Sequence, residues 1–254
     1  MSLSQRISRV RLVGSSDAIR RVELKALMAA RVDKNVLITG ERGVGKAVVA
    51  RFIHEHSDRS QKGFAVLNCE GLPDLLVESE LFGHLQGSFA GAYRDKPGLL
   101  ASVNGGTVFL DEVGALSPRM QARLLRFLAT GEYLGIGSDH VQIQARLNVR
   151  LIASTAADLP AQVDAGLFLD DLHGRLNTLS LAVPPLRERR DDIPSLVDHF
   201  VAQFAGRGTA VKTDAASPAG EISSEVYAAL CRAEWPGNVQ ELRSVVFRQL
   251  LSAH

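Results

Sequence analysis

Apolar residues occur along this chain in two arrangements. Short unbroken apolar runs predict buried strands, whereas apolar positions that recur every three or four residues predict amphipathic helices. The runs predict five strands, at residues 35–39, 64–68, 106–110, 149–154 and 179–183. Because helical patterns separate the runs, the sequence predicts a parallel, doubly wound α/β sheet with ligands at the carboxyl ends of its strands.

Helices are expected between the strands. Helical patterns begin near residue 16 and also cover residues 48–56, 78–84 and 172–176. The clearest boundaries belong to a helix that Ser117 and Pro118 open as cap and first residue and that Gly131 ends. Residues 135–148 are rich in glycine and alternate in polarity, which predicts a hairpin.

The pattern changes after Pro185, because the remaining segments are helical or polar. Apolar residues recur at helical spacing from residue 193 to 204, and a polar loop is expected at 206–220. Asn238 and Glu241 have the spacing of a capping box for the last helix. We therefore predict two domains, an α/β domain at residues 1–186 and a helical domain at 187–254.

A glycine-rich loop lies between the first predicted strand and the next helix. It consists of Gly40, Glu41, Arg42, Gly43, Val44, Gly45, Lys46 and Ala47. Glycines allow backbone N–H groups to turn toward phosphate oxygens, the helix N-terminus adds partial positive charge, and Lys46 can reach the outer phosphates. The alternative is an ordinary glycine turn, but the strand, loop, lysine and helix together favour phosphate binding.

Metal chemistry is expected at a second strand end. Ala47 stands where most phosphate-binding loops carry a Ser or Thr that holds Mg²⁺, so another residue must supply a ligand. Asp111 and Glu112 follow the buried run 106–110. Asp111 can hold Mg²⁺, and Glu112 can orient and polarise an attacking water molecule. We therefore predict a nucleoside-triphosphate site.

A short segment with two glycines interrupts the helical pattern after residue 84. It reads Gly87, Ser88, Phe89, Ala90, Gly91 and Ala92. A phenylalanine at the tip of an exposed loop is typical of a contact site. The alternative, in which Phe89 packs back onto its own domain, stays open on these residues alone.

Composition narrows the class of protein. Of 254 residues, 46% are apolar and 22% are charged, which predicts a packed core. The net charge of +1 argues against a generally basic nucleic-acid surface. Cys69 and Cys231 are too few for a disulfide framework and favour a reducing cytoplasm, with Cys69 expected as a buried thiol. No apolar run has membrane-spanning length, so no membrane partner is expected.

The motifs taken together resemble the central AAA+ ATPase domain of bacterial enhancer-binding proteins, the NtrC-like activators of sigma-54 RNA polymerase. The resemblance extends from Val13 and Gly14 to the last helix. The matching strings are GERGVGKA, NCEGLP, ESELFGH, GSFAGA, NGGTVFLDEVG, PPLRERRDDIP and WPGNVQEL. It implies an α/β fold of the AAA+ P-loop NTPase type, with a doubly wound parallel sheet and a small C-terminal α-helical lid.

The same resemblance implies roles for particular residues. ATP or ADP with Mg²⁺ is the implied ligand, and Val13 and Gly14 are expected beside the adenine. Asn68 is expected to contact Glu112, Arg175 to face the ATP of a neighbouring subunit, and Phe89 to touch the sigma factor. The implied partners are further copies of this chain, in a hexameric or heptameric ring or an inactive dimer. DNA contact is expected only through a domain absent from these residues.

Four positions depart from the family pattern. The tip that usually reads GAFTGA has Ala90 in place of threonine. Leu169 replaces one of two arginines in the segment that usually reads FREDLYYRL, while Arg175 keeps the other. Ala156 replaces the Asn of the AATN sensor stretch, and Gln240 replaces an arginine that contacts nucleotide. The departures indicate a domain with specialised or weakened ATP hydrolysis and sigma-54 engagement.

The leading interpretation is therefore an ATP-binding, cytoplasmic AAA+ domain of a sigma-54-type transcriptional regulator with weakened hydrolysis and impaired sigma-54 engagement. One alternative is a fully active remodelling ATPase that tolerates the changes. Another, from a different class, is a nucleotide-sensing oligomerisation module that regulates transcription without sigma-54. An unrelated phosphate-loop enzyme fits least, because it gives the ESELFGH string and the Phe89 tip no role.

Overall fold

The computed structural model describes residues 10–133, 135–137, 146–207 and 224–252. Its contacts divide the chain into two compact units. The α/β unit comprises residues 1–10, 25–39 and 47–182, and the helical unit comprises 11–24, 40–46 and 183–254. The boundary expected after residue 186 assigned 11–24 and 40–46 to the α/β part. Their contacts instead group them with the helices, because Asp192, Asn238 and neighbouring residues bind their backbone.

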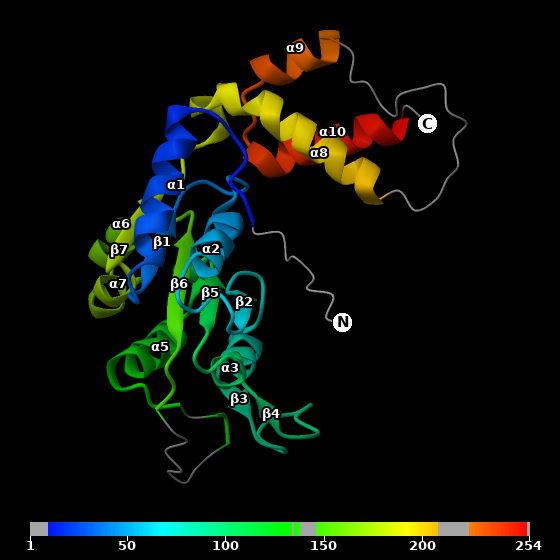
Figure 1. Cartoon of the computed structure of the whole chain (residues 1–254). Coiled ribbons are helices and arrows are strands. Elements are labelled where there is room, and N and C mark those ends of the chain that lie inside the picture. The colour runs from blue at the N-terminus through cyan, green and yellow to red at the C-terminus, as the bar shows by residue number, and fades with distance from the viewer. Residues whose placement is uncertain (1–9, 134, 138–145, 208–223, 253–254) are drawn as a thin grey trace, which may run out of the picture. The chain divides into compact units, whose positions relative to one another are not determined.

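A five-stranded parallel sheet forms the centre of the α/β unit (Figure 1). The strand order is β2 (Phe64–Asn68), β5 (Thr107–Asp111), β6 (Arg150–Thr155), β1 (Val36–Thr39) and β7 (Leu179–Ala182). Each neighbouring pair is parallel. The five strands and the doubly wound α/β architecture expected from the apolar runs are therefore confirmed.

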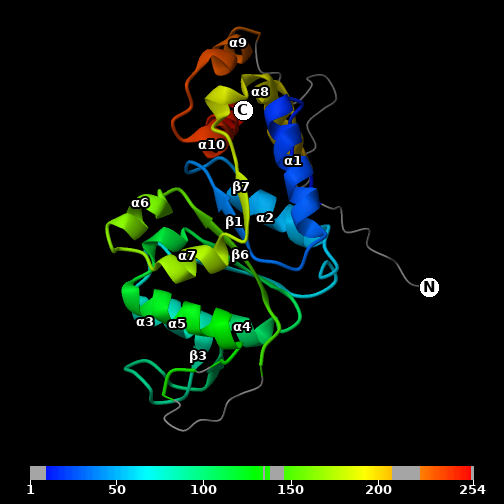
Figure 2. The same cartoon turned by 90° about the vertical axis from the view of Figure 1, so that its left-hand side faces the viewer.

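Successive residues of the central strands point to opposite faces of the sheet, so each strand contributes side chains to two apolar layers. Leu37, Val108 and Leu151 join one core cluster with residues of α3 (Asp74–Phe82), α5 (Pro118–Thr130) and α7 (Asp170–Leu176). Figure 2 shows α5 and α7 side by side, and the two helices are in contact. Phe109 and Ile152, which point to the opposite face, are fully buried.

Two helices pack near that opposite face. They are α1 (Asp17–Ala30) and α2 (Lys46–Glu55). The Arg150 guanidinium donates to the Ala29 carbonyl of α1 at 2.7 Å, and His54 of α2 lies 3.0 Å from the Thr107 hydroxyl. The start of α1 at Asp17 agrees with the expected cap region.

Local signals fixed the ends of α5. The Ser117 hydroxyl accepts a hydrogen bond from the Met120 N–H, Pro118 is the first helical residue, and Gly131 ends the helix at φ 70°. This confirms the expected Ser-Pro start and glycine stop. The sequence did not predict the short elements β3 (Gly83–His84), β4 (Lys96–Pro97), α4 (Leu99–Ser102), η1 (Val113–Ala115) and α6 (Leu159–Asp164).

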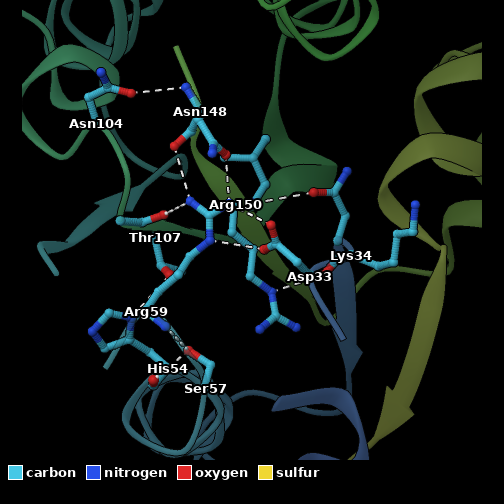
Figure 3. A network of polar contacts seen from close by, with 12 residues as sticks. Asp33, Lys34, His54, Ser57, Arg59, Asn104, Thr107, Asn148 and Arg150 are labelled. Atoms are coloured by element: carbon cyan, nitrogen blue, oxygen red, sulfur yellow. Dashed lines mark hydrogen bonds and ion pairs between the residues drawn. The ribbon is translucent and has the colours of Figure 1, made fainter. Parts of the chain in front are cut away.

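A polar network joins the segments that begin three of the strands (Figure 3). Arg59 donates to both carboxylate oxygens of Asp33, at 2.9 and 2.6 Å, and to the Gly106 carbonyl. It also donates to the backbone and side-chain oxygens of Asn148. The Arg59 hydrogen bond holds the pKa of Asp33 below its usual value. Because its groups satisfy one another at the amino ends of β1, β5 and β6, we assign this network a structural role.

The helical unit contains η2 (Leu186–Glu188), η3 (Arg190–Asp192), α8 (Ile193–Arg207), α9 (Ser224–Arg232) and α10 (Asn238–Ser252). Helices α8 and α10 lie side by side (Figure 1) and share an apolar core that includes Trp235 and Leu242. The segment is helical as expected. The predicted polar loop at 206–220 and hairpin at 135–148 fall largely outside the described residues.

The capping box expected at the start of α10 forms only in part. The Glu241 carboxylate accepts a hydrogen bond from the Gly237 N–H at 2.8 Å, close to the expected arrangement. The Asn238 side chain does not cap the helix. Its φ of 54° is left-handed, and its amide instead binds Glu41, Arg42 and Leu186.

Candidate functional site

The glycine loop continues directly from the last residue of β1, Thr39, and ends where α2 begins at Lys46. Gly43 has φ 77° and Gly45 has φ 104°, values that side chains other than glycine rarely adopt. A Cβ atom on Gly43 would also lie only 2.3 Å from the Gly237 carbonyl oxygen. Gly43 is therefore required both by its backbone conformation and by close packing.

The Lys46 ammonium is folded back over the start of the loop. It is buried, and its Nζ donates to the carbonyl oxygens of Gly40 at 2.8 Å and Glu41 at 3.3 Å. An ammonium held by neutral carbonyls can exchange them for phosphate oxygens, which bind a cation more strongly. Ala47 is exposed and carries no side-chain oxygen, as expected from the sequence.

Glu41, the second residue of the loop, is tied to the helical segment that follows β7. The Arg187 guanidinium donates to both oxygens of the Glu41 carboxylate, at 2.8 and 2.6 Å. Hydrogen bonds from Arg187 and then Asn238 lower the pKa of Glu41 to about 2. The carboxylate is therefore charged at neutral pH. Because Arg187 neutralises that charge, the carboxylate would repel a phosphate bound in the loop less than an unpaired carboxylate would.

Val13 and Gly14, expected beside an adenine, lie in the helical unit. Val13 packs against the core around Ile193, and Gly14 has φ 146°. A Cβ on Gly14 would lie 2.6 Å from the Asp192 carboxylate, which accepts hydrogen bonds from the Ser15 and Ser16 N–H groups. A buried carboxylate thus fixes the chain on the C-terminal side of both residues.

A concavity of about 250 Å³ adjoins the loop within the helical unit. Its lining residues are Arg42, Gly43, Gly237, Gln240, Glu241 and Ser244. Gln240, expected to stand in place of a nucleotide-contacting arginine, therefore lines the concavity beside the loop. Arg243, one turn later, lies with its guanidinium over the Phe247 ring at 5.2 Å and does not line this concavity.

The two carboxylates lie where β5 ends in the α/β unit. Asp111 is the last residue of the strand, and its Oδ1 accepts a hydrogen bond from the Ser154 hydroxyl of β6. Glu112 adopts a left-handed φ of 56°, and its Oε2 accepts from the Ala156 N–H at 2.8 Å. Residues of β6 and the following turn therefore orient both side chains.

Asp111 is the candidate metal ligand at this strand end. Among the described residues, no three His, Cys, Asp or Glu side chains gather in a way that could hold a metal ion alone. Mg²⁺ is commonly held by one or two carboxylates together with phosphate oxygens and water. Asp111 at the strand end fits that requirement.

Asn68 and Arg175 lie in the α/β unit. Asn68 pairs in register with Asp111, but its side-chain oxygen accepts from the Glu70 N–H at 2.9 Å, so the expected contact with Glu112 stays a prediction. Arg175 is exposed on α7. Leu169 precedes that helix, is 37% exposed, and its N–H donates to Gln121.

The segment from Gly87 to Ala92 closes on itself between β3 and β4. The Gly87 N–H donates to the Ala92 carbonyl at 2.8 Å. The Phe89 ring is half-buried and stands edge-on to the His84 ring, with centroids 4.9 Å apart. Ala90 is exposed beside it. In this structure Phe89 therefore packs back onto its own unit.

Two further expectations concern the Cys69 thiol and membrane-spanning helices. Cys69 is buried, as predicted, and burial raises the pKa of its thiol to about 12, so it is unreactive at neutral pH. Within the described part of the chain, the helices are too short or too polar to cross a bilayer.

Sequence reasoning missed four polar residues that organise this region. Asp192, Arg187 and Arg189 belong to the PPLRERRDDIP string, and Asn238 belongs to WPGNVQEL. Each binds a segment more than a hundred residues away in sequence. The sequence marked Asn238 only as a helix cap and the other three only as members of a charged string, and neither signal named the distant partner.

Comparison with known protein families agrees with this geometry. Residues 12–182 match the family described as the Sigma-54 interaction domain, and residues 187–254 match the AAA+ ATPase lid domain. Together the two matches cover nearly all of the chain.

Curated relatives are transcriptional regulators. The chain is 42% identical over 241 residues to the transcriptional regulatory protein ZraR of Escherichia coli K12, covering 94% of this chain and 52% of ZraR. It is 41% identical over 238 residues to the response regulator PilR of Pseudomonas aeruginosa, covering 94% of this chain and 51% of PilR. The chain thus spans about half the length of these relatives.

Solved structures show the same fold. The crystal structure of NtrX from Brucella abortus in complex with ADP is 32% identical, with a TM-score of 0.83, over 96% of this chain and 52% of NtrX. The ATP complex of the same protein gives a TM-score of 0.82 at 32% identity, over 96% of this chain and 53% of NtrX. By fold, motifs and relatives, the chain belongs to the sigma-54 interaction AAA+ domains of NtrC-like enhancer-binding transcriptional regulators.

Proposed function

We propose that this domain binds ATP and ADP and serves a sigma-54-type transcriptional regulator with weakened hydrolysis. The observation that carries the proposal is the glycine loop with Lys46 folded over it at the end of β1. Backbone N–H groups of the loop bind the phosphates, and Lys46 exchanges its carbonyl partners for phosphate oxygens. The ADP and ATP complexes of the NtrX relative support the same ligand class.

Hydrolysis is assigned to the strand-end carboxylates and to a neighbouring copy. Asp111 would hold Mg²⁺, which would neutralise phosphate charge, and Glu112 would position the attacking water. Arg175 acts in trans, since its side chain is exposed on α7. Asn68 couples the nucleotide state to Glu112. These roles require a ring, for which a hexamer or heptamer is the family expectation.

Two observations support weakened turnover. In this structure the Glu112 carboxylate accepts from the Ala156 N–H, where the family supplies an asparagine side chain in addition. Leu169 is an apolar, partly exposed residue at a position that the family gives to arginine. Each loss removes a polar group from the expected catalytic arrangement.

Nucleotide titration tests the proposal. A fluorescent ADP analogue is titrated against wild type, Lys46→Ala and the control Lys62→Ala, which changes a lysine outside the loop. We expect wild type and the control to bind alike and Lys46→Ala to lose at least about tenfold in affinity, since it removes a charge-assisted contact. Equal affinity for all three proteins would refute the proposal.

A second candidate is a nucleotide-sensing oligomerisation module that regulates transcription without sigma-54. The exposed Ala90 at the tip favours it, because the tip lacks the family's hydroxyl. DNA contact in either case belongs to parts of the regulator outside this chain, and the cytoplasm is the proposed compartment. Sigma-54 capture, described in the Discussion, separates the two candidates.

A further inference from the structure

Three consecutive carbonyl groups of the glycine loop are bound by residues that follow β7. The Arg42 carbonyl accepts from the Asn238 side chain at 3.0 Å, and the Gly43 carbonyl accepts from the Gln240 N–H at 3.2 Å. The Val44 carbonyl accepts from the Arg189 guanidinium at 2.8 Å. All these groups belong to the helical unit, so the loop and its partners form one compact body.

This binding fixes the direction of the loop's N–H groups. In a planar trans peptide, the C=O of one residue and the N–H of the next point in opposite directions. With the carbonyls of Arg42, Gly43 and Val44 held toward the helices, the N–H groups of residues 43–45 are directed away from them. Those are the N–H groups that a phosphate-binding loop presents to its ligand.

Asn238 is the centre of the arrangement. It is fully buried, and its Nδ2 donates both to the Arg42 carbonyl and to the Glu41 carboxylate, at 3.1 Å for the latter. Its Oδ1 accepts from the Leu186 N–H at 2.7 Å. Because the amide uses both its donor and its acceptor, a side chain with only one of these groups would leave some of the partners without a hydrogen bond.

We propose that Asn238, Arg187 and Arg189 form a bracket that holds the phosphate loop in its ligand-ready shape, so that residues 145 to 197 positions away from their loop partners set nucleotide affinity. The bracket residues are positioning residues, because they act through the loop. They preorganise it, and preorganisation improves affinity by removing the cost of ordering the loop on binding. The inference rests on the proposed nucleotide binding.

Matched variants test the bracket. Arg187→Gln removes the ion pair with Glu41, and Arg190→Gln is its control, because it removes the same charge from an exposed ion pair with Glu234. Asn238→Gly removes the amide but keeps a residue that tolerates φ 54°. The readouts are affinity for a fluorescent ADP analogue, thermal unfolding, and amide hydrogen exchange of the nucleotide-free protein.

We expect about tenfold weaker ADP binding for Arg187→Gln and a larger loss for Asn238→Gly, with Arg190→Gln within about twofold of wild type. Exchange is expected to quicken at residues 42–46 and stay unchanged in β1 and β5. Glu41→Gln combined with Arg187→Gln is expected to lose no more than the larger single effect, because both act through one contact.

Wild-type affinity in both bracket variants would overturn the inference, as would faster exchange spread evenly over the chain, which indicates general destabilisation. The outcome also separates the two proposals. If wild type fails to bind ADP, the proposed function fails. If wild type binds and Lys46→Ala does not, yet the bracket variants bind normally, only the bracket fails.

Discussion

His54 is a buried histidine whose protonation is coupled to folding. Its Nδ1 lies 3.0 Å from the Thr107 hydroxyl, and burial lowers the pKa of the ring below its usual value of 6.5. The unfolded chain therefore binds a proton more readily than the folded one as the pH falls through about 6.5. Stability is fully present above that pH and declines below it.

We expect the free energy of unfolding to fall with pH below about 6.5 by up to about 1.4 kcal/mol per unit from this group. His54→Gln keeps a hydrogen-bonding group but does not titrate, so its decline is expected to be shallower. His199→Gln, an exposed control on α8, should follow wild type. Urea unfolding between pH 7.5 and 5.5 measures the three slopes, and parallel slopes for wild type and His54→Gln would contradict the assignment.

Arg175 is assigned as the group that acts on the nucleotide of a neighbouring copy. A trans arginine can be worth on the order of 10³–10⁵ in rate. We expect Arg175→Ala to abolish turnover while leaving ADP affinity nearly intact, because the proposed role places the residue at the nucleotide of another subunit. Steady-state ATP hydrolysis and ADP titration measure the two quantities.

Leu169→Arg is the companion variant, since it restores the family's second arginine. It is expected to change turnover much less than Arg175→Ala does. If instead Leu169→Arg raises turnover by orders of magnitude and Arg175→Ala does little, the roles of the two positions are reversed.

Residue patterns indicated short local motifs, but they did not indicate the distant partners of those motifs. The glycine loop, Lys46 and the Asp111–Glu112 pair were recognisable because each motif is short and continuous. The partners of Asn238 were not, since its amide binds Glu41 and Arg42, which are 197 and 196 positions away. Helical spacing indicated a capping box there, and only the Glu241 half of it forms.

At the scale of elements, continuous apolar runs were reliable and short elements were not. The five strands were predicted because each is a continuous apolar run, and α5 was predicted because its capping residues adjoin it in the sequence. Strands β3 and β4 have two residues each, too few to show a period, and they exist because they pair with each other.

The segment from Gly87 to Ala92 between those strands yields a prediction. A hydroxyl at position 90 would add a hydrogen-bonding group and restrict the tip, whereas the exposed Ala90 supplies neither. We expect wild type, trapped with a transition-state analogue of ATP, to form little stable complex with sigma-54. Ala90→Thr is expected to increase the complex at least several-fold.

Ser88→Thr is a matched control for that experiment, because it adds a methyl group in the same segment without changing position 90. It is expected to leave the complex at the wild-type level. A robust wild-type complex that Ala90→Thr does not alter would contradict impaired sigma-54 engagement. It would indicate an ordinary sigma-54 activator and would count against the nucleotide-sensing alternative.

At the scale of the whole molecule, the chain comprises two compact units. The helical unit contains the phosphate loop and its bracket, and the α/β unit contains Asp111, Glu112 and Arg175. The sequence predicted both parts, but it assigned residues 40–46 to the sheet. It did so because the loop follows β1 in the chain, whereas its hydrogen bonds join it to residues after β7.

The measurement that tests the central claim most directly is steady-state ATP hydrolysis over a range of protein concentrations, with nucleotide binding measured in parallel. We expect saturable binding that depends on Lys46, together with slow turnover whose rate per subunit rises with protein concentration, because the proposed mechanism uses Arg175 in trans. Rapid turnover that is independent of concentration and insensitive to Arg175→Ala, or hydrolysis that persists in Lys46→Ala, would contradict the account.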